Sequence, residues 1–491
     1  MQYNSRHENT VNPVSKRLLR LRAQSFLLAM GMLLAGLVFT PFPVGAAAQT
    51  EERITGKLSP HLPHKALWAL VVVDMATEKE IIHIGTAVNK PMVPGSLVKL
   101  VTAGAVLDHA ASYGKLDMIT TLSSDGLIHH HELLGNLYLT GRGDAIVSSE
   151  AIRGMVWELS RRGVTKITGD VVVDATLLDA QGLERKRKGA AHASPGALGL
   201  DLHTVAITAY PSQAGEAPVI KVEPVNNSVR IAMEARTVET TASPLKISQL
   251  DDLSFRISGN IPIGAGPFRQ RFPLSDPAIY AGGTLRTMLQ ESNISLAGEV
   301  RNGRTPAAAT QLAEIEPPGL DAMLRDMNMN SLNVVADNLL LILGGQRFAP
   351  PGTREKGLRA VSEFLERLGF TADDARIADG SGIHEGNRVT AGFMARYLQK
   401  ASVQPWFDSL YASLPRAGMD GTLRGMDFVD ERFRVKTGIL EDAYALAGYG
   451  VDRGGRRLSF AFIVNHPGSG VMNMEKAGAA VLRHLSTEVF S

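Results

Sequence analysis

Cysteine is absent from this chain of 491 residues. Its absence excludes disulfide bonds, thiolate zinc sites and cysteine nucleophiles, so any catalysis must use other groups. A large excess of one charge is also lacking, because 51 basic and 49 acidic side chains leave a formal net charge of only +2. Binding to nucleic-acid phosphates requires a dense basic surface, so we expect no nucleic-acid partner.

Long apolar runs are absent after the N-terminus, as are internal repeats. The first 48 residues combine basic residues over 16–22, an apolar run over 26–39 and the small residues Ala46–Ala48. The apolar run is shorter than the roughly 20 residues that span a bilayer. We therefore predict a signal peptide over 1–48, export to the periplasm or cell envelope, and membrane contact only through this segment. An uncleaved membrane anchor is the alternative.

The length and the apolar content of 44% predict a folded protein of two or three packed units. Apolar and β-branched residues over 68–74 and 81–84 predict a hairpin, and helical spacing begins at Ser96, directly after Pro94–Gly95. From 116 to 274, short strand-like runs alternate with Gly, Asp and Pro turns, which is typical of a β-rich region.

Helical patterns dominate after Asp276–Pro277, which resembles an N-cap followed by proline at the first helical position. Three strand patterns joined by short turns then precede a closing amphipathic helix. The expected elements are helical segments over 320–343, 355–368 and 390–399, strands over 433–440, 444–451 and 458–464, and a helix over 474–489.

These patterns predict an α+β fold. The N-terminal hairpin and the three C-terminal strands form a five-stranded antiparallel sheet, which needs flanking helices to bury its faces. The predicted organisation is a split domain over 52–115 and 275–491, interrupted by a long β-rich insert over 116–274.

Three short motifs indicate where chemistry takes place. Ser96–Lys99 reads Ser-Leu-Val-Lys, Ser331–Asn333 reads Ser-Leu-Asn, and Lys436–Gly438 reads Lys-Thr-Gly. Each motif alone arises readily by chance in a chain of this length. Their occurrence together, at a helix start, between two helical patterns and on a strand, indicates catalysis by a serine nucleophile.

The first motif pairs a nucleophile with a base. Ser96 and Lys99 are three residues apart, so one helical turn brings the amine to the hydroxyl. Lys99 acts as a base only when its amine is neutral, and burial beside a second cation, for which Lys436 is the candidate, favours the neutral form. The helix dipole also favours an alkoxide at Ser96.

The second motif carries a hydroxyl and an amide. Ser331 is a candidate for passing a proton to the leaving amine, and Asn333 is a candidate for orienting Lys99 or binding a substrate amide. The alternative is that Ser331 and Asn333 only cap the neighbouring helices.

The third motif lies on a predicted strand. Lys436 and Thr437 can bind a substrate carboxylate, and Gly438 allows a ligand to approach closely. The following backbone N–H, that of Ile439, is free to join an oxyanion hole. A peptide substrate can lie beside such a sheet edge.

The run His129–His131, followed by Glu132, contains residue types that can bind a metal ion. Consecutive residues of a strand point to opposite faces, so these histidines cannot converge on one ion. A surface turn is the better explanation, and no metal ligand is assigned.

In their order and spacing, the three motifs resemble those of the class C low-molecular-mass penicillin-binding proteins, the D-alanyl-D-alanine carboxypeptidase/endopeptidase family. The similarity extends from about Ile54 to the C-terminus. Further family-like stretches are 94–100, 135–139, 169–174, 336–340, 379–382, 414–423 and 445–449.

The resemblance implies a penicillin-binding transpeptidase-like, or serine β-lactamase-like, catalytic domain in two halves, with an insert of two small β-rich domains. It implies that Ser96 attacks D-Ala–D-Ala bonds or cross-links of peptidoglycan stem peptides, and that the acyl-enzyme is then hydrolysed. The backbone N–H groups of Ser96 and Ile439 would form the oxyanion hole. β-Lactam antibiotics are the implied inhibitors, no metal or organic cofactor is implied, and homodimer formation stays open.

One position departs from the family pattern. The family usually has a hydroxyl residue where this chain has Ile439, and that hydroxyl helps to hold the terminal carboxylate of the substrate. Its loss costs on the order of 1 kcal/mol in carboxylate binding. The acidic pair Glu441–Asp442 acts in the same direction, which leaves an endopeptidase preference open.

Two other functions remain as alternatives. A β-lactamase or esterase would use the same Ser-x-x-Lys chemistry, but the long insert argues against it. A non-catalytic cell-wall binding protein would keep the fold without turnover. The intact Ser96, Lys99, Ser331, Asn333 and Lys436 argue against that alternative, and Ile439 keeps it open.

Overall fold

The computed structural model describes residues 44–183, 192–240, 243–466 and 472–489. The chain divides into two compact units, Met1–Arg53 and Ile54–Ser491. Most of the predicted signal peptide, positions 1–43, lies outside the described residues, and helix α2 (Val44–Leu58) runs through Ala46–Ala48. Among the described residues, no helix is both long and apolar enough to cross a bilayer.

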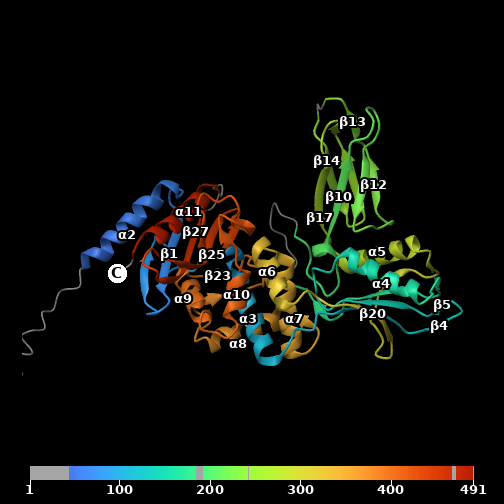
Figure 1. Ribbon diagram of the computed structural model, residues 1–491, viewed down its shortest axis with the longest axis horizontal. Coiled ribbons are helices and arrows are strands. Elements are labelled where there is room, and N and C mark those ends of the chain that lie inside the picture. Colours follow the sequence, from blue (N-terminus) through green and yellow to red (C-terminus); the bar gives the residue numbers. More distant parts are fainter. Residues whose placement is uncertain (1–43, 184–191, 241–242, 467–471, 490–491) are drawn as a thin grey trace, which may run out of the picture. The chain divides into compact units, whose positions relative to one another are not determined.

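Strands from the early and the late parts of the chain together form one antiparallel sheet (Figure 1). Its strand order is β2-β1-β27-β26-β25-β24. The five predicted strands are confirmed, and a two-residue strand, β24, adds a sixth at one edge. The bounds are β1 (Leu67–Asp74), β2 (Glu80–Ile84), β24 (Arg416–Ala417), β25 (Asp430–Leu440), β26 (Ala443–Val451) and β27 (Arg457–Asn465).

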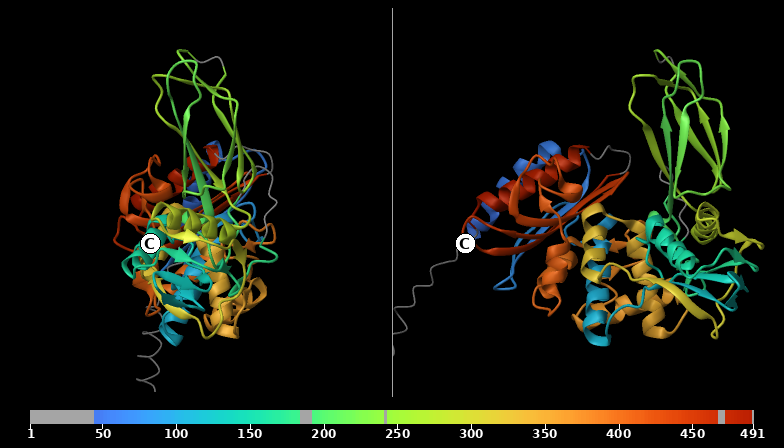
Figure 2. Two further views of the ribbon diagram at one scale, coloured as in Figure 1. Left: turned by 90° about the vertical axis from the view of Figure 1, so that its right-hand side faces the viewer. Right: turned by 45° about the vertical axis from the view of Figure 1, so that its right-hand side comes forward.

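Side chains alternate between the two faces of this sheet, and each face has its own core. In β1, Val71 and Val73 belong to one apolar cluster, whereas Leu70 and Val72 belong to the other. Helix α11 covers the second face together with Ile54 and Leu58 from the end of α2, and helices α3 and α6–α10 pack on the first (Figure 2). Their bounds are α3 (Val98–Tyr113), α6 (Leu320–Asn330), α7 (Asn333–Phe348), α8 (Arg354–Arg367), α9 (Ala391–Ala401), α10 (Phe407–Ser413) and α11 (Met472–Thr487).

The helical pattern over 320–343 contains two helices, so the second motif lies between helices as expected. Helix α6 ends at Ser331, whose φ of 54° lies in the left-handed region, and α7 begins two residues later at Asn333. A helix cannot continue through a left-handed residue, so the chain turns here. The turn places the second motif at a junction between helices.

The insert has a first core that contains helices as well as strands. Helices α4 (Ser149–Arg161) and α5 (Pro277–Glu291) pack together on two sheets, of orders β19-β8-β6-β3-β20 and β18-β7-β5-β4. Asp276 caps α5 as predicted, because its Oδ1 accepts the N–H of Ile279 at 3.1 Å. The strands are β3 (Thr120–Ser124), β4 (Leu127–His129), β5 (Glu132–Leu134), β6 (Leu137–Thr140), β7 (Lys166–Ile167), β8 (Val171–Asp174), β18 (Ser295–Leu296), β19 (Val300–Asn302) and β20 (Thr310–Ile315).

Residue 274, the expected end of the insert, lies in sequence within this group of packed elements. Helix α5 and strands β18–β20 follow that position in sequence, yet they share sheets and a core with strands that precede it. The layer that begins at β3 therefore extends to Ile315. The histidine run lies at the turn between β4 and β5, where His130 and His131 are exposed.

A second core within the insert is built almost entirely from strands. One sheet has the order β11-β10-β17 and another the order β12-β15-β14, and β13 pairs with β16. Phe255 and Phe272 meet between them, with ring centroids 5.3 Å apart. The strands are β10 (Thr204–Tyr210), β11 (Val219–Glu223), β12 (Arg230–Met233), β13 (Arg236–Val238), β14 (Lys246–Asp251), β15 (Ser254–Ser258), β16 (Asn260–Pro262) and β17 (Phe268–Pro273).

Two further strand pairs are short. β9 pairs with β21, and β22 pairs with β23. The bounds are β9 (Leu178–Asp179), β21 (Gly352–Thr353), β22 (Ala375–Arg376) and β23 (Arg388–Val389). The β9–β21 pair joins the insert to the segment that leads into α8.

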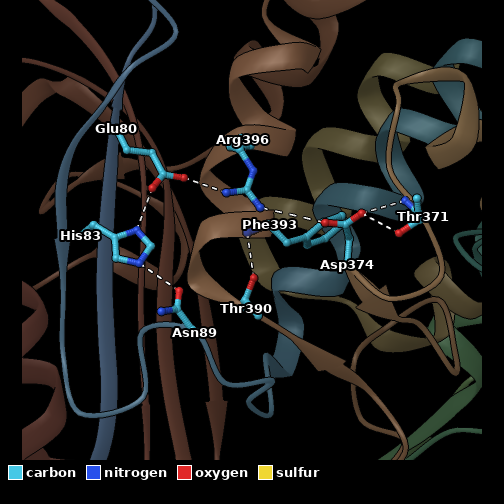
Figure 3. A network of polar contacts seen from close by, with 8 residues as sticks. All are labelled: Glu80, His83, Asn89, Thr371, Asp374, Thr390, Phe393 and Arg396. Atoms are coloured by element: carbon cyan, nitrogen blue, oxygen red, sulfur yellow. Dashed lines mark hydrogen bonds and ion pairs between the residues drawn. The ribbon is translucent and has the colours of Figure 1, made fainter.

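A polar network ties the edge strand β2 to helix α9 (Figure 3). Glu80 accepts hydrogen bonds from Arg396 of α9 and from His83 of its own strand, each at 2.7 Å. His83 also contacts Asn89 at 3.0 Å, and Arg396 lies 4.0 Å from Asp374. These side chains are partly exposed, so solvent screens their charges.

The buried ring of Phe393 should contribute far more to stability than this exposed network. Phe393 is fully buried and its ring lies 5.0 Å from that of Phe370. We expect Phe393→Ala to lower the free energy of unfolding by roughly 3–5 kcal/mol, because it leaves a cavity in the core. Arg396→Met should cost less than about 1 kcal/mol, because it removes only exposed ion pairs. Chemical denaturation measures both values, and equal losses would contradict the assignment of the core.

Candidate active site

Ser96 lies where an irregular turn enters helix α3. A 3₁₀ turn, η2 (Gly95–Leu97), precedes α3. Gly95 has a φ of +52°, and a side chain there would lie 3.3 Å from the backbone of Gly438. Glycine therefore allows the turn to pass close to strand β25. Ser96 itself is 9% exposed, so its hydroxyl is close to the surface of an otherwise buried helix.

Lys99 is fully buried and touches three oxygen atoms. Its Nζ lies 2.9 Å from Ser96 Oγ, 2.7 Å from Asn333 Oδ1 and 2.8 Å from the carbonyl oxygen of Ser381. The expected contact between Ser96 and Lys99 is present, and Asn333 reaches the same amine from the first turn of α7. The first and second motifs therefore meet at one nitrogen atom.

The Ser381 carbonyl is a contact that sequence reasoning missed. It belongs to the Asp379–Gly382 turn, where buried Asp379 accepts the N–H of Gly382 at 2.7 Å and that of His384 at 2.8 Å. Thr102 of α3 donates its hydroxyl to the carbonyl of Gly380 at 2.7 Å. These bonds fix the turn against the helix that carries the nucleophile. The available signal was the Asp-Gly-Ser-Gly sequence, which is typical of a tight turn.

The Ser331 hydroxyl joins the second motif to the third. Its Oγ accepts a hydrogen bond of 3.0 Å from Lys436 Nζ. Ser331 is the C-cap of α6 through its backbone, and Asn333 is the first residue of α7, whose N-cap is Leu332. The side chains of Ser331 and Asn333 contact the lysines, so these residues do more than end or begin a helix.

Lys436 and Thr437 lie on β25, and both are buried. Lys436 Nζ also donates to the carbonyl of Thr437 at 2.8 Å. The Thr437 hydroxyl contacts the hydroxyl of Thr422 at 2.7 Å. Thr422 was not predicted as a site residue, although it falls in the family-like stretch 414–423.

Gly438 brings strand β25 against the nucleophile. A Cβ at this position would lie 2.5 Å from the carbonyl oxygen of Pro94 and 3.0 Å from the backbone nitrogen of Ser96. Any side chain would therefore force the strand and the turn apart. Close approach to the protein's own backbone is one reason for glycine here, in addition to the predicted approach of a ligand.

The outer edge of β25 is unpaired beside the nucleophile. β24 pairs with β25 only at Arg434 and Asp430, so the described β-ladder on that side stops before Lys436. On the other side, β26 pairs with β25 up to Leu440, which faces Ala443 across a two-residue turn. Alternation in such a ladder leaves every second N–H pointing away from β26.

Burial and like charge act together on the lysines. Burial, and then the charge of Lys99, hold the pKa of the Lys436 ammonium well below its usual range. The interaction is mutual, so two protonated amines are disfavoured in this site. The site thus contains a hydroxyl, two buried amines that disfavour being charged together, and an unpaired sheet edge. These features together suit acyl transfer.

The comparisons with known proteins point to one family. A family model for D-Ala-D-Ala carboxypeptidase 3 (S13) matches residues 52–485. A D-alanyl-D-alanine carboxypeptidase of Actinomadura sp. is 29% identical over 448 residues, which cover 85% of this chain and 81% of that protein. The crystal structure of penicillin binding protein 4 from Haemophilus influenzae has a TM-score of 0.74 and 22% identity, and the match covers 88% of this chain and 99% of that one. A structure of the same protein complexed with a β-lactam has a TM-score of 0.70.

These findings confirm both the fold class and the resemblance inferred from the motifs. The structural likeness supports an α+β transpeptidase-like fold with an inserted β-rich region. The family model spans nearly all of the chain that follows the predicted signal peptide. The chain belongs to the D-Ala-D-Ala carboxypeptidase 3 (S13) family of serine-type carboxypeptidases.

Proposed function

We propose that this chain is an exported serine D,D-peptidase that cleaves D-Ala–D-Ala bonds, or D-Ala–diamino acid cross-links, of peptidoglycan through an acyl-enzyme on Ser96. The observation that carries the proposal is the 2.9 Å contact between Ser96 Oγ and the buried Nζ of Lys99. Membership of the S13 family supports the substrate class. Export is supported by the basic and apolar pattern of residues 1–48.

Lys99 acts as the base in its neutral form. A neutral amine has two hydrogens and one lone pair. Two neighbours of Lys99, Asn333 Oδ1 and the Ser381 carbonyl, can only accept hydrogen bonds, so they take the two hydrogens. The lone pair is then left for the O–H of Ser96. As Ser96 Oγ bonds to the substrate carbonyl carbon, its proton moves to Lys99 Nζ.

The backbone N–H groups of Ser96 and Ile439 stabilise the oxyanion that forms. The pairing of Leu440 with Ala443 supports this role, because alternation along the ladder directs the N–H of Ile439 away from β26. Contact between Gly438 and the turn at Ser96 supports it as well. Donors held by a rigid sheet and a helix start need no reorganisation during the reaction.

Ser331 and Lys436 serve the leaving amine. When the tetrahedral intermediate collapses, the C–N bond breaks and the released amine needs a proton. The Ser331 hydroxyl gives its proton to the amine and is reprotonated by Lys436, to which it is hydrogen-bonded. The proton that Lys99 took from Ser96 replaces the one lost by Lys436, so Lys99 is neutral again. A water molecule then attacks the ester on Ser96, Lys99 takes the proton of that water, and the same proton returns to Ser96 Oγ as the ester bond breaks. No metal or organic cofactor takes part in these proposed steps.

The same acylation should occur with β-lactam antibiotics as inhibitors, an expectation supported by the β-lactam complex of the H. influenzae relative. We expect intact-mass spectrometry to find one penicillin on the wild-type protein and none on Ser96→Ala. The control Ser362→Ala removes an exposed hydroxyl of α8 and should retain the adduct. Absence of an adduct on the folded wild type would contradict the proposal, and an adduct lost within seconds would favour a β-lactamase.

Gly438→Ala should slow acylation because its Cβ would separate β25 from the turn at Ser96. Displacement of reacting groups by about 1 Å costs on the order of a hundred-fold in rate. The control Gly154→Ala adds a Cβ to α4 with no atom within 4 Å and should leave the rate unchanged. The measurement is the rate of penicillin binding by stopped-flow fluorescence, and a Gly438→Ala rate equal to that of wild type would contradict the proposed geometry.

A further inference from the structure

A pocket adjoins the active site on the outer side of strand β25. Its volume is about 230 Å³, below the roughly 300–1,000 Å³ typical of pockets for drug-sized ligands. A pocket of this size accepts one amino-acid residue rather than a long chain. Strand β25, the 422–427 loop and helix α11 contribute the lining, which includes Arg424, Asp427, Thr437, Ile439, Glu475 and Lys476.

The pocket continues directly from the proposed reaction centre. Thr437 and Ile439 belong to the strand segment that holds the Lys-Thr-Gly motif and the proposed oxyanion donor. Thr422, which contacts the Thr437 hydroxyl at 2.7 Å, also lines the pocket. A substrate acylating Ser96 must direct its leaving group to one side of this strand, and the pocket provides space there.

The charges of the pocket favour an anion. Asp427 lies 3.4 Å from Arg483 of α11, so its charge is already partly compensated. Among the described residues, neither the Arg424 guanidinium nor the Lys476 ammonium has an ion pair or side-chain hydrogen bond. Glu475 is the acidic side chain left to oppose these two cations. The uncompensated charge of the lining is therefore positive.

The pocket wall also contains a buried hydroxyl. Tyr444 lines the same pocket and is 1% exposed, and its hydroxyl has no hydrogen-bond partner among the described residues. Burial, and then the charge of Glu475, raise the pKa of this phenol, so it stays protonated and can donate. This hydroxyl lies against Gly478 of α11, so it belongs to the polar wall behind the pocket and not to its open surface.

We propose that this pocket, the Arg424 pocket, binds the residue on the leaving side of the scissile bond, and that Arg424 pairs with the carboxylate of that residue. The inference rests on the proposed peptidase function. Ile439 offers no hydroxyl for this carboxylate, and its side chain is 43% exposed beside the pocket. A guanidinium can hold a carboxylate through two hydrogen bonds, so Arg424 compensates for the missing hydroxyl.

The test compares two synthetic peptides that end in D-Ala-D-Ala and differ only at the C-terminus. One has the free carboxylate and the other a carboxamide. Arg424→Gln should lower kcat/KM for the carboxylate peptide roughly ten- to thirty-fold, because a charged hydrogen-bonded pair is lost. It should change kcat/KM for the carboxamide peptide less than about three-fold. The matched control Arg304→Gln removes an exposed arginine of the β19–β20 loop and should change neither value.

The outcomes separate this inference from the proposed function. If the wild type cleaves neither peptide and takes up no penicillin, the peptidase function itself fails. If the wild type cleaves the carboxylate peptide but Arg424→Gln has no effect, the inference is overturned. An equal loss on both peptides would also overturn it, because Arg424 would then act on the protein's structure and not on the carboxylate.

Discussion

The proposed chemistry depends on two lysine side chains buried in one site. Lys99 and Lys436 are both fully buried, and charge on one amine opposes charge on the other. Burial leaves little water to stabilise two ammonium groups, so the site favours a neutral form of at least one amine. In the proposed mechanism, a neutral amine takes the proton of the serine hydroxyl, an inherently weak nucleophile, during attack. The contacts around Lys99 and Lys436 determine which amine takes this role.

The rest of the fold keeps these groups together. Helix α3 packs in the core on the first face of the sheet, and Ser96 and Lys99 lie at its start. The break between α6 and α7 directs Ser331 and Asn333 toward the lysines. Strand β25 brings Lys436 from the far end of the chain. Because the segments come from three separate parts of the sequence, the site exists only when the split domain has assembled around its insert.

The sequence was sufficient to predict the central sheet, the helix start at Ser96 and the three motifs. Alternation, helical spacing and short motifs are local patterns that can be read directly from a sequence. It was insufficient for contacts made by backbone atoms or by side chains outside the motifs, such as the Ser381 carbonyl and the Thr422 hydroxyl. It also ended the insert at 274, whereas α5 and β18–β20 share the insert's first core. An amphipathic helix shows that one face is buried, but not which core buries it.

The most direct test is to observe the proton on Lys99. Nitrogen-15 NMR of lysine-labelled protein distinguishes a neutral amine from an ammonium, and comparison with Lys99→Met assigns the signal. We expect a neutral Lys99 amine at the pH at which penicillin acylates Ser96, and a slower acylation as the pH falls and both lysines become protonated. An ammonium at Lys99 throughout the range of rapid acylation would contradict its role as the base.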